Sequence, residues 1–212
     1  MEGNVNRVNS KQILKKVIYC FVLNLLVLFL FLVFYSLSYE MPDNLAYAQF
    51  IAEGDYTFDY MGYLICAFIG IIQKIIYPIN AFIVFHLLFS YISFVIITFV
   101  FVDKFKNFIG TLFSVLLLSF YAVSHYGNVS FTRDPALFCC AGFLLILHYS
   151  SKHCVTPLII GVLMIVIGSM YRFLVFEVCV LITAVYIFAD SVSSFLSVKK
   201  QSVVLKRFSP FF

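Results

Sequence analysis

Long uncharged apolar runs are the feature that most restricts the fold of this chain. The first extends from Val17 to Tyr39 without a charged residue. A helix needs roughly 20 apolar residues to cross a bilayer, and the lipid offers no partners for exposed backbone groups. Further runs follow, so that 63% of the 212 residues are apolar and 11% are charged. The sequence therefore predicts an integral membrane protein built from transmembrane helices.

Hydropathy predicts an all-α, polytopic helix bundle of about six spans in one transmembrane domain, residues 1–212. The predicted spans are residues 17–39, 79–102, 107–125, 135–150, 155–171 and 173–190. The fourth and fifth spans are short. The first run is too long for a secretory signal and lacks a small-residue cleavage site, so we expect it to be retained.

The basic residues give the predicted spans a direction. The positive-inside rule places eleven of the fourteen in the cytoplasm, namely Arg7, Lys11, Lys15, Lys16, Lys104, Lys106, Lys152, Lys199, Lys200, Lys206 and Arg207. Lys74, Arg133 and Arg172 then lie outside, with six of the ten acidic residues. Both charge signs therefore agree with six crossings, cytoplasmic N- and C-termini, and a cell inner (plasma) membrane.

The predicted outer loop, residues 40–77, begins with a surface helix. Pro42-Asp43-Asn44 supplies cap chemistry, an apolar stretch follows, and Gly54 ends it. A second apolar stretch at residues 61–77 contains Gln73 and Lys74, which favours an interfacial or re-entrant helix. A seventh span there would reverse every later span against the positive-inside rule, so we do not favour it.

The same loop and its approach carry five of the ten acidic residues within residues 40–59, namely Glu40, Asp43, Glu53, Asp55 and Asp59. Asp43 follows the first span closely, so we expect its carboxylate in the headgroup region. A carboxylate there can act as a general base on a hydroxyl within hydrogen-bond distance. The alternative is that Asp43 caps the following helix by accepting backbone N–H groups.

Two arginines are predicted on the same outer side. Arg133 opens the fourth span, and Arg172 marks the turn between the fifth and sixth. A guanidinium can hold a phosphate through two parallel hydrogen bonds, so the pair is a candidate pocket for a lipid-linked phosphate. The alternative is that each arginine only anchors its helix at the membrane surface.

Two further acids lie close to these arginines in the sequence. Asp134 precedes Pro135, which is the pattern of a helix N-cap followed by proline at the first helical position. Glu177 lies inside the sixth predicted span, where an acid is a functional candidate because burying it unpaired is costly. The alternative for Glu177 is an internal ion pair or a protonated carboxyl.

Neither histidine nor cysteine spacing indicates a metal centre. His86 and His125 have no second ligand at metal spacing, so we expect hydrogen-bonded histidines rather than ligands. The six cysteines form no C-x-x-C pair. The sequence also lacks a nucleic-acid-binding basic patch and any nucleotide-binding or serine-hydrolase motif. We expect no cofactor and no nucleic acid, although the acidic loop has spare carboxylates for a divalent metal.

The segment Pro42-Asp-Asn-Leu-Ala-Tyr-Ala-Gln-Phe-Ile-Ala-Glu-Gly-Asp-Tyr is similar to a loose D-x(3)-Y-A-x-x-I-x-x-G pattern. That pattern follows the first span in polyprenyl-phosphate-dependent glycosyltransferases of the GT-C superfamily. Thr132-Arg-Asp-Pro and Tyr171-Arg-Phe also have counterparts there. Over residues 15–190 the chain therefore resembles the N-terminal half of these enzymes. It also resembles Wzy- and EpsG-type polysaccharide polymerases, which often have Arg-Gln where this chain has Arg133-Asp134.

The resemblance implies glycosyl transfer, or polymerisation of repeat units, on the outer leaflet in O-antigen, capsule or exopolysaccharide assembly. The partners would be a polyprenyl-linked sugar donor and membrane lipids. Asp43 would be the catalytic base, and Arg133 and Arg172 would bind the donor phosphate. The supporting candidates are Glu40, Asp55, Asp59, Asp134 and Glu177.

Family members are usually longer and often have a Pro-rich element after the first surface helix, which this chain lacks. The sequence is therefore compatible with a truncated product. The alternative function is a non-enzymatic membrane component, such as a flippase-like transporter subunit or an accessory protein. A transporter should have polar span centres, whereas apart from Glu177 and Asn24 these centres are nearly all apolar.

Overall fold

The computed structural model describes residues 2–58, 60–105, 107–150 and 155–208, with side chains for residues 11–193 in those ranges except Asn107. It divides into two units, Met1–Phe176 and Glu177–Phe212. The elements are α1 (Glu2–Phe34), β1 (Ser38–Tyr39), α2 (Pro42–Glu53), α3 (Tyr63–Ile76), α4 (Ala81–Lys104), α5 (Asn107–Gly127), β2 (Asn128–Val129), α6 (Arg133–Tyr149), α7 (Val155–Tyr171) and α8 (Phe173–Phe208). The predicted all-α fold is confirmed.

Four of the described helices are long and apolar enough to cross a membrane, which indicates a membrane protein. Their apolar stretches are Lys11–Phe34, Ala81–Lys104, Phe108–Gly127 and Phe173–Ser193. They coincide with the first, second, third and sixth predicted spans. The fourth and fifth predicted spans are α6 and α7, each 17 residues long. Helices of that length reach about 25 Å, so their crossing of the bilayer stays a prediction.

Two predicted spans end five or more residues away from the predicted position. α1 ends at Phe34 rather than at residue 39, because Ser38 and Tyr39 form β1 and pair in parallel with β2. The hydropathy of this stretch could not reveal a partner so distant in the chain. α8 continues to Phe208 instead of ending at residue 190. No glycine or proline interrupts residues 191–208, so the helix has no local reason to stop earlier.

The predicted surface helix is confirmed as α2. It begins at Pro42, and Gly54 ends it with a φ of 94°, a left-handed conformation that glycine adopts without strain. The expected cap chemistry is wrong, because the N-cap residue is Met41 and no side chain caps the helix. Asp43 lies in the first turn, past the cap position. Its carboxylate is therefore not used as an N-cap.

The second helix of the predicted outer loop is α3, which has 14 residues and is too short to cross a bilayer. Its N-terminal side is tied to the end of α7, since the N–H of Gly62 donates to the Met170 carbonyl at 2.9 Å. Its C-terminal side is tied to α4, since Gln73 Oε1 accepts from the Ala81 N–H at 2.7 Å. These contacts hold α3 against the ends of two longer helices.

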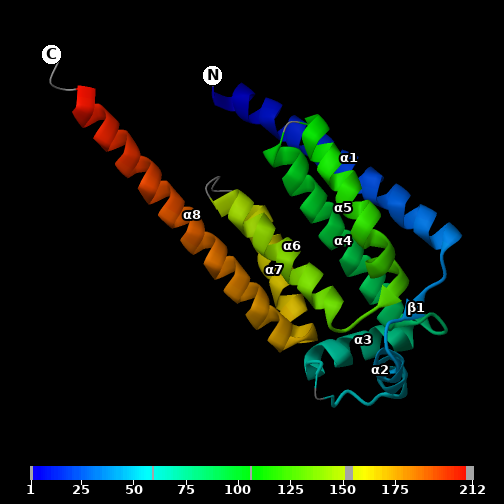
Figure 1. Ribbon diagram of the computed structural model, residues 1–212. Helices are drawn as coiled ribbons and strands as arrows, with labels where there is room; N and C mark the ends of the chain where they lie inside the picture. The colour runs from blue at the N-terminus through cyan, green and yellow to red at the C-terminus, as the bar shows by residue number, and fades with distance from the viewer. Residues whose placement is uncertain (1, 59, 106, 151–154, 209–212) are drawn as a thin grey trace. The chain divides into compact units, whose positions relative to one another are not determined.

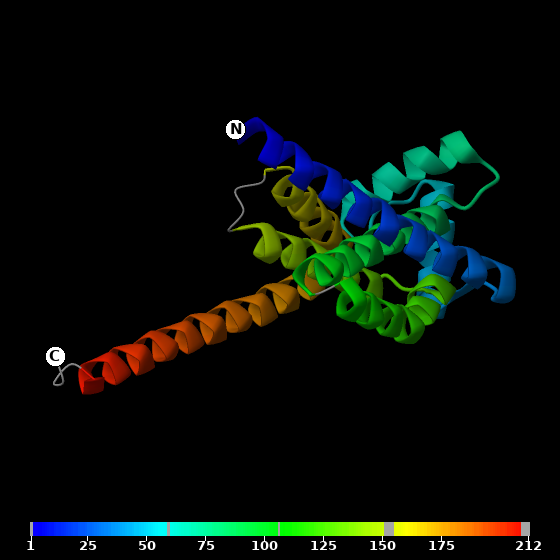
Figure 2. The same ribbon diagram turned by 90° about the horizontal axis from the view of Figure 1, so that it is seen from above.

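Within the first unit, α1, α4 and α5 lie side by side, and α6 packs on α4 and α7 (Figures 1 and 2). Asn24 on α1 donates to Thr98 Oγ1 on α4 at 2.9 Å. The α6–α7 contact depends on two glycines. A Cβ on Gly142 would lie 2.5 Å from the Gly161 carbonyl oxygen, so only glycine allows this approach.

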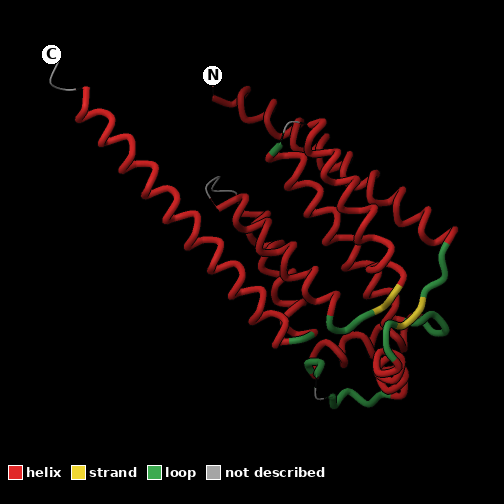
Figure 3. The backbone as a smooth tube through the Cα atoms, viewed as in Figure 1, coloured by secondary structure: helices red, strands yellow, loops and turns green. Residues whose placement is uncertain are grey.

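The first unit has two chemically different ends. Both short strands and the connections around α2 and α3 gather at one end, which we call the loop end (Figure 3). The start of α1 and the connection between α4 and α5 lie at the other (Figure 1). We call it the basic end, because Lys11, Lys15, Lys16 and Lys104 lie there. The loop end contains the segments predicted outside, and the basic end contains those predicted in the cytoplasm; the side of the membrane that each end faces stays a prediction.

Candidate functional site

The connection between α5 and α6, residues 128–132, is the centre of the loop end. Phe131 is buried within it, and the Phe131 N–H donates to Asn44 Oδ1 on α2 at 3.0 Å. The Tyr47 ring, also on α2, meets the Phe131 ring edge-on with centroids 4.9 Å apart. The helix that carries Asp43 is therefore attached to the 128–132 connection by both a hydrogen bond and an aromatic contact.

Arg172 reaches the same connection from the end of α7. Its Nη1 donates to Thr132 Oγ1. Its guanidinium carbon lies 5.1 Å from the centroid of the Phe131 ring and 5.4 Å from that of Tyr60. Stacking on aromatic faces orients a guanidinium while leaving several of its N–H groups available. Arg172 and α2 thus both contact one residue, Phe131.

Arg133 is bound mainly by two backbone carbonyl groups, one in the last turn of α5 and one just after it in β2. Its Nη2 donates to the carbonyls of Ser124 at 2.8 Å and Asn128 at 2.6 Å. The last carbonyls of a helix lack intrahelical partners and carry partial negative charge, so a cation is favourable there. Its Nη1 lies 3.4 Å from Glu40 Oε1, and the Arg133 side chain is 29% exposed. Arg133 is therefore positioned but still reachable from solvent.

Asp134 occupies a buried polar cluster that also contains both candidate histidines. Asp134 Oδ1 lies 3.1 Å from His125 Nδ1, and Oδ2 accepts from the Ser130 N–H at 2.9 Å. His86 Nδ1 lies 2.5 Å from Oδ2, at ion-pair distance but without the alignment of a hydrogen bond. The cluster joins α4, α5 and α6, and it buries all three side chains.

A carboxylate is costly to bury unless charge and hydrogen bonds compensate it. The contact from His125 requires the tautomer with a proton on Nδ1. The expected N-cap role of Asp134 is wrong, since the helix starts at Arg133 with Thr132 as its N-cap residue. Its carboxylate instead reaches back to Ser130 and inward to the histidines.

The sequence did not predict this cluster, because the three residues come from separate helices with no shared motif. The sequence offered one usable signal for it. His86, His125 and Asp134 were each predicted toward the outer end of a different span. The prediction of hydrogen-bonded histidines is confirmed for His125, whose Nδ1 lies 3.1 Å from Asp134 Oδ1. It is wrong for His86, whose two ring nitrogens have no hydrogen-bond partner among the described residues. Within the described residues, no group of three or more His, Cys, Asp or Glu side chains is placed to hold a metal ion.

The other candidate acids are dispersed. Asp43 is exposed on the first turn of α2, where its carboxylate makes no ion pair with any described residue. Glu177 is exposed and belongs to the second unit. Asp59 lies outside the described residues. Of the candidate acids, Glu40 thus lies near Arg133, and Asp134 lies against the two histidines. Asp43 is exposed to solvent.

Asp55 has a local role in the turn after α2. Its Oδ1 accepts from the Thr57 N–H at 3.1 Å and from the Thr57 hydroxyl at 2.8 Å. The backbone hydrogen bond from Thr57, followed by the hydroxyl bond, holds the pKa of the Asp55 carboxyl below its ordinary value. This arrangement is an Asx turn, which explains why an aspartate follows Gly54.

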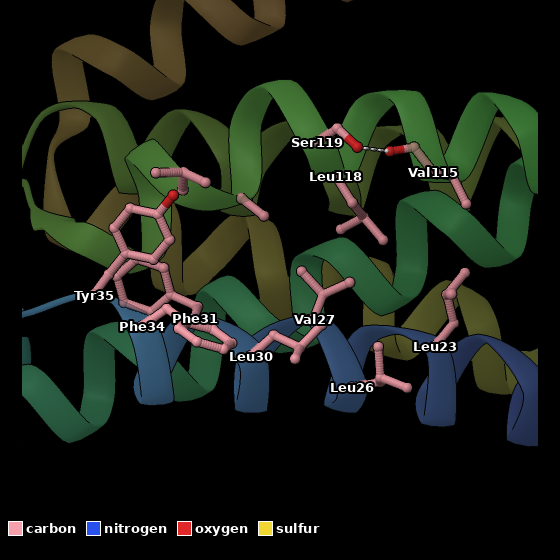
Figure 4. A pocket seen from close by; sticks show the side chains of 12 residues that line it. Leu23, Leu26, Val27, Leu30, Phe31, Phe34, Tyr35, Val115, Leu118 and Ser119 are labelled. Carbon is pink, nitrogen blue, oxygen red and sulfur yellow. Dashed lines mark hydrogen bonds between the residues drawn. The ribbon is translucent and has the colours of Figure 1, made fainter.

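An apolar groove runs between α1 and α5 (Figure 4). It has a volume of about 340 Å³. Its lining residues are Leu23, Leu26, Val27, Leu30, Phe31, Phe34, Tyr35, Val115, Leu118, Ser119, Ala122 and Val123. At its loop end the groove reaches Val123, whose neighbour Ser124 accepts from Arg133. The groove has the apolar composition needed to hold a hydrocarbon chain.

No protein-family model, curated protein or solved structure matches this chain.

Proposed function

We propose that this protein is a membrane-embedded glycosyltransferase or repeat-unit polymerase of the cell inner (plasma) membrane. It acts at the loop end on a polyprenyl-linked sugar during cell-surface polysaccharide assembly, and both termini are cytoplasmic. One observation carries the proposal. The helix with Asp43 and the guanidinium of Arg172 both contact Phe131, so an accessible acid and an oriented cation share one support.

In the proposed reaction, Asp43 removes the proton from the attacking hydroxyl of the acceptor sugar. The hydroxyl oxygen then forms a bond to the anomeric carbon of the donor, and the bond from that carbon to the phosphate oxygen breaks. The polyprenyl phosphate leaves with the bonding electron pair. Arg172 and Arg133 stabilise the negative charge that develops on this leaving group.

The two arginines have different parts in this proposal. Arg172 has aromatic support and one hydroxyl contact, so it can still offer N–H donors to a phosphate. Arg133 has more of its donors committed to carbonyl groups, one of them the carbonyl of Ser124, which follows the groove residue Val123 in the chain. The prenyl chain in that groove would bring its phosphate toward Arg133.

The transporter alternative has less support from the described spans. Asn24 is one of the two polar residues expected at a span centre, and its amide nitrogen is used within the bundle. It donates to the Cys20 carbonyl at 2.7 Å and to Thr98 Oγ1 at 2.9 Å. These contacts are typical of helix association in a membrane rather than of a polar conduction path.

The proposal is tested in the native host after deletion of the gene, by complementation with variants. Polysaccharide length and amount are measured on gels, and the lipid-linked precursors are measured by mass spectrometry. Asp43→Asn keeps the size of the side chain but removes the base, so we expect product formation to fall about 100-fold or more. Lipid-linked precursor should accumulate at the same time.

Glu53→Gln is the matched control, because Glu53 is an exposed acid at the other end of α2. This variant should make a normal amount of polysaccharide. Arg172→Ala should also cause precursor accumulation, whereas Arg172→Lys should retain part of the activity through its positive charge. Normal polysaccharide with Asp43→Asn, at normal protein levels, would show that Asp43 is not the base and remove the main support for the enzyme proposal.

A further inference from the structure

A second cavity lies at the basic end of the first unit, between α1, the end of α4 and the start of α5. Its volume is about 400 Å³, within the range of roughly 300–1,000 Å³ that is typical of small-molecule sites. It is lined by Lys15, Lys16 and Tyr19 of α1, Val102 of α4, and Phe108 and Thr111 of α5. The cavity is therefore built by three helices at the depth of a membrane surface.

One of the two lysines that line this cavity, Lys16, belongs to an ion-pair network. Lys16 Nζ lies 2.8 Å from Asp103 Oδ1, and Asp103 Oδ2 lies 2.8 Å from His148 Nε2. Asp103 thereby fixes Lys16 and joins α1, α4 and α6. Lys15, by contrast, is exposed and lines the cavity without a described ion pair.

Hydroxyl and apolar groups complete the lining. Tyr19 donates from its hydroxyl to Thr111 Oγ1 at 3.3 Å, which joins α1 to α5 across the cavity. The Val102 and Phe108 side chains supply apolar surface. A ligand that satisfies all of these groups has an anionic head with hydrogen-bond acceptors and an apolar tail. Cations and hydroxyls would bind the head, and the apolar residues would contact the start of the tail.

We propose that this cavity is a specific binding site for the headgroup of an anionic phospholipid. The phosphodiester accepts from Lys15 and from the donor groups of Lys16 that Asp103 does not use. The location of the cavity at the basic end, the predicted cytoplasmic side, fits this ligand. Basic pockets between transmembrane helices on the cytoplasmic side bind anionic headgroups. The proposal concerns the end opposite the candidate active site and does not depend on the enzymatic function.

The test uses the full-length protein, purified in a zwitterionic detergent and titrated with phosphatidylglycerol. Bound lipid is counted by native mass spectrometry, and phosphatidylcholine and soluble glycerol 3-phosphate are titrated in parallel. We expect one saturable phosphatidylglycerol site that the other two compounds do not fill. Lys15→Gln should weaken that site about fivefold, the contribution of one lysine at a membrane surface. Thr111→Val should weaken it less.

Lys11→Gln is the matched control. Lys11 lies on the same helix at the same end and is exposed, but it does not line the cavity. It should leave the affinity unchanged. Equal losses from Lys11→Gln and Lys15→Gln would show general attraction to a basic surface and overturn the site. Saturation of the same site by glycerol 3-phosphate alone would overturn the lipid as its ligand. The unfolding temperature of each lipid-free variant shows that its fold is intact.

Discussion

His86 Nδ1 on α4 and Asp134 Oδ2 on α6 lie 2.5 Å apart, and both residues are 1% exposed. This contact joins two helices at the loop end beneath the candidate site. Arg133, the residue before Asp134 in the chain, donates to the Ser124 carbonyl near the end of α5. The buried contact between His86 and Asp134 thus holds the start of α6, where Arg133 lies. Removing this contact should therefore destabilise the loop end.

Asp134→Asn should reduce the free energy of unfolding by about 3–5 kcal/mol, because it leaves two buried imidazoles without their charged partner. The measurement is unfolding in lipid nanodiscs, followed by tyrosine fluorescence since the chain has no tryptophan. Asp43→Asn is the control, and as an exposed substitution it should change stability by less than about 0.5 kcal/mol. Equal stability of the two variants would contradict an ionised, paired Asp134.

Gly142→Ala should destabilise the protein by about 1–3 kcal/mol through overpacking of α6 against α7. In an unconstrained helix the same change would be stabilising, by roughly 1 kcal/mol. The sign of the effect therefore tests the close approach to Gly161 directly. Cys140→Ala, an exposed site on the same helix, is the control and should be nearly neutral. Stabilisation by Gly142→Ala would mean that the two helices lie further apart.

The hydrogen bond between Asn24 and Thr98 should show a measurable coupling energy. A double-mutant cycle with Asn24→Leu and Thr98→Val removes each polar group with little change in volume. We expect a coupling of about 0.6 kcal/mol and no more than about 1.7 kcal/mol, the range of such bonds between membrane helices. Unfolding in nanodiscs supplies the four free energies. A coupling of zero would contradict this contact between α1 and α4.

The turn at Asp55 should respond to acid in a defined direction. The pKa of Asp55 is lowered in the folded chain, so the ionised carboxylate stabilises the turn above the unfolded pKa. This contribution is lost as the pH falls through the folded pKa. An NMR titration of the Asp55 carboxyl measures it. Thr57→Val should raise the Asp55 pKa by removing the hydroxyl donor, whereas Ser38→Ala should leave it unchanged.

Local sequence signals predicted much of the helical structure. The apolar runs predicted the positions of α1, α4 and α5, and Gly54 predicted the end of α2. Each of these signals acts within its own segment, through hydropathy or backbone conformation. The predicted N-caps at Asp43 and Asp134 were wrong, since cap geometry depends on where the preceding chain is held.

The candidate site was predicted only in part for the same reason. Placing Arg133 and Arg172 on one side followed from charge and span direction. Phe131 had no recognisable signal, although α2 and Arg172 both contact it. A buried aromatic residue in a connection looks like any other apolar residue until its neighbours are known.

The sequence by itself determined that the chain forms helices long and apolar enough to cross a membrane, with one basic end, because hydropathy and charge are properties of each residue. The tertiary structure alone decided which polar groups meet. His86, His125 and Asp134 come together because three helices pack at one end. The pairs of Arg133 with Glu40 and of Lys16 with Asp103 arise in the same way. Such contacts depend on distances between segments that are far apart in the chain.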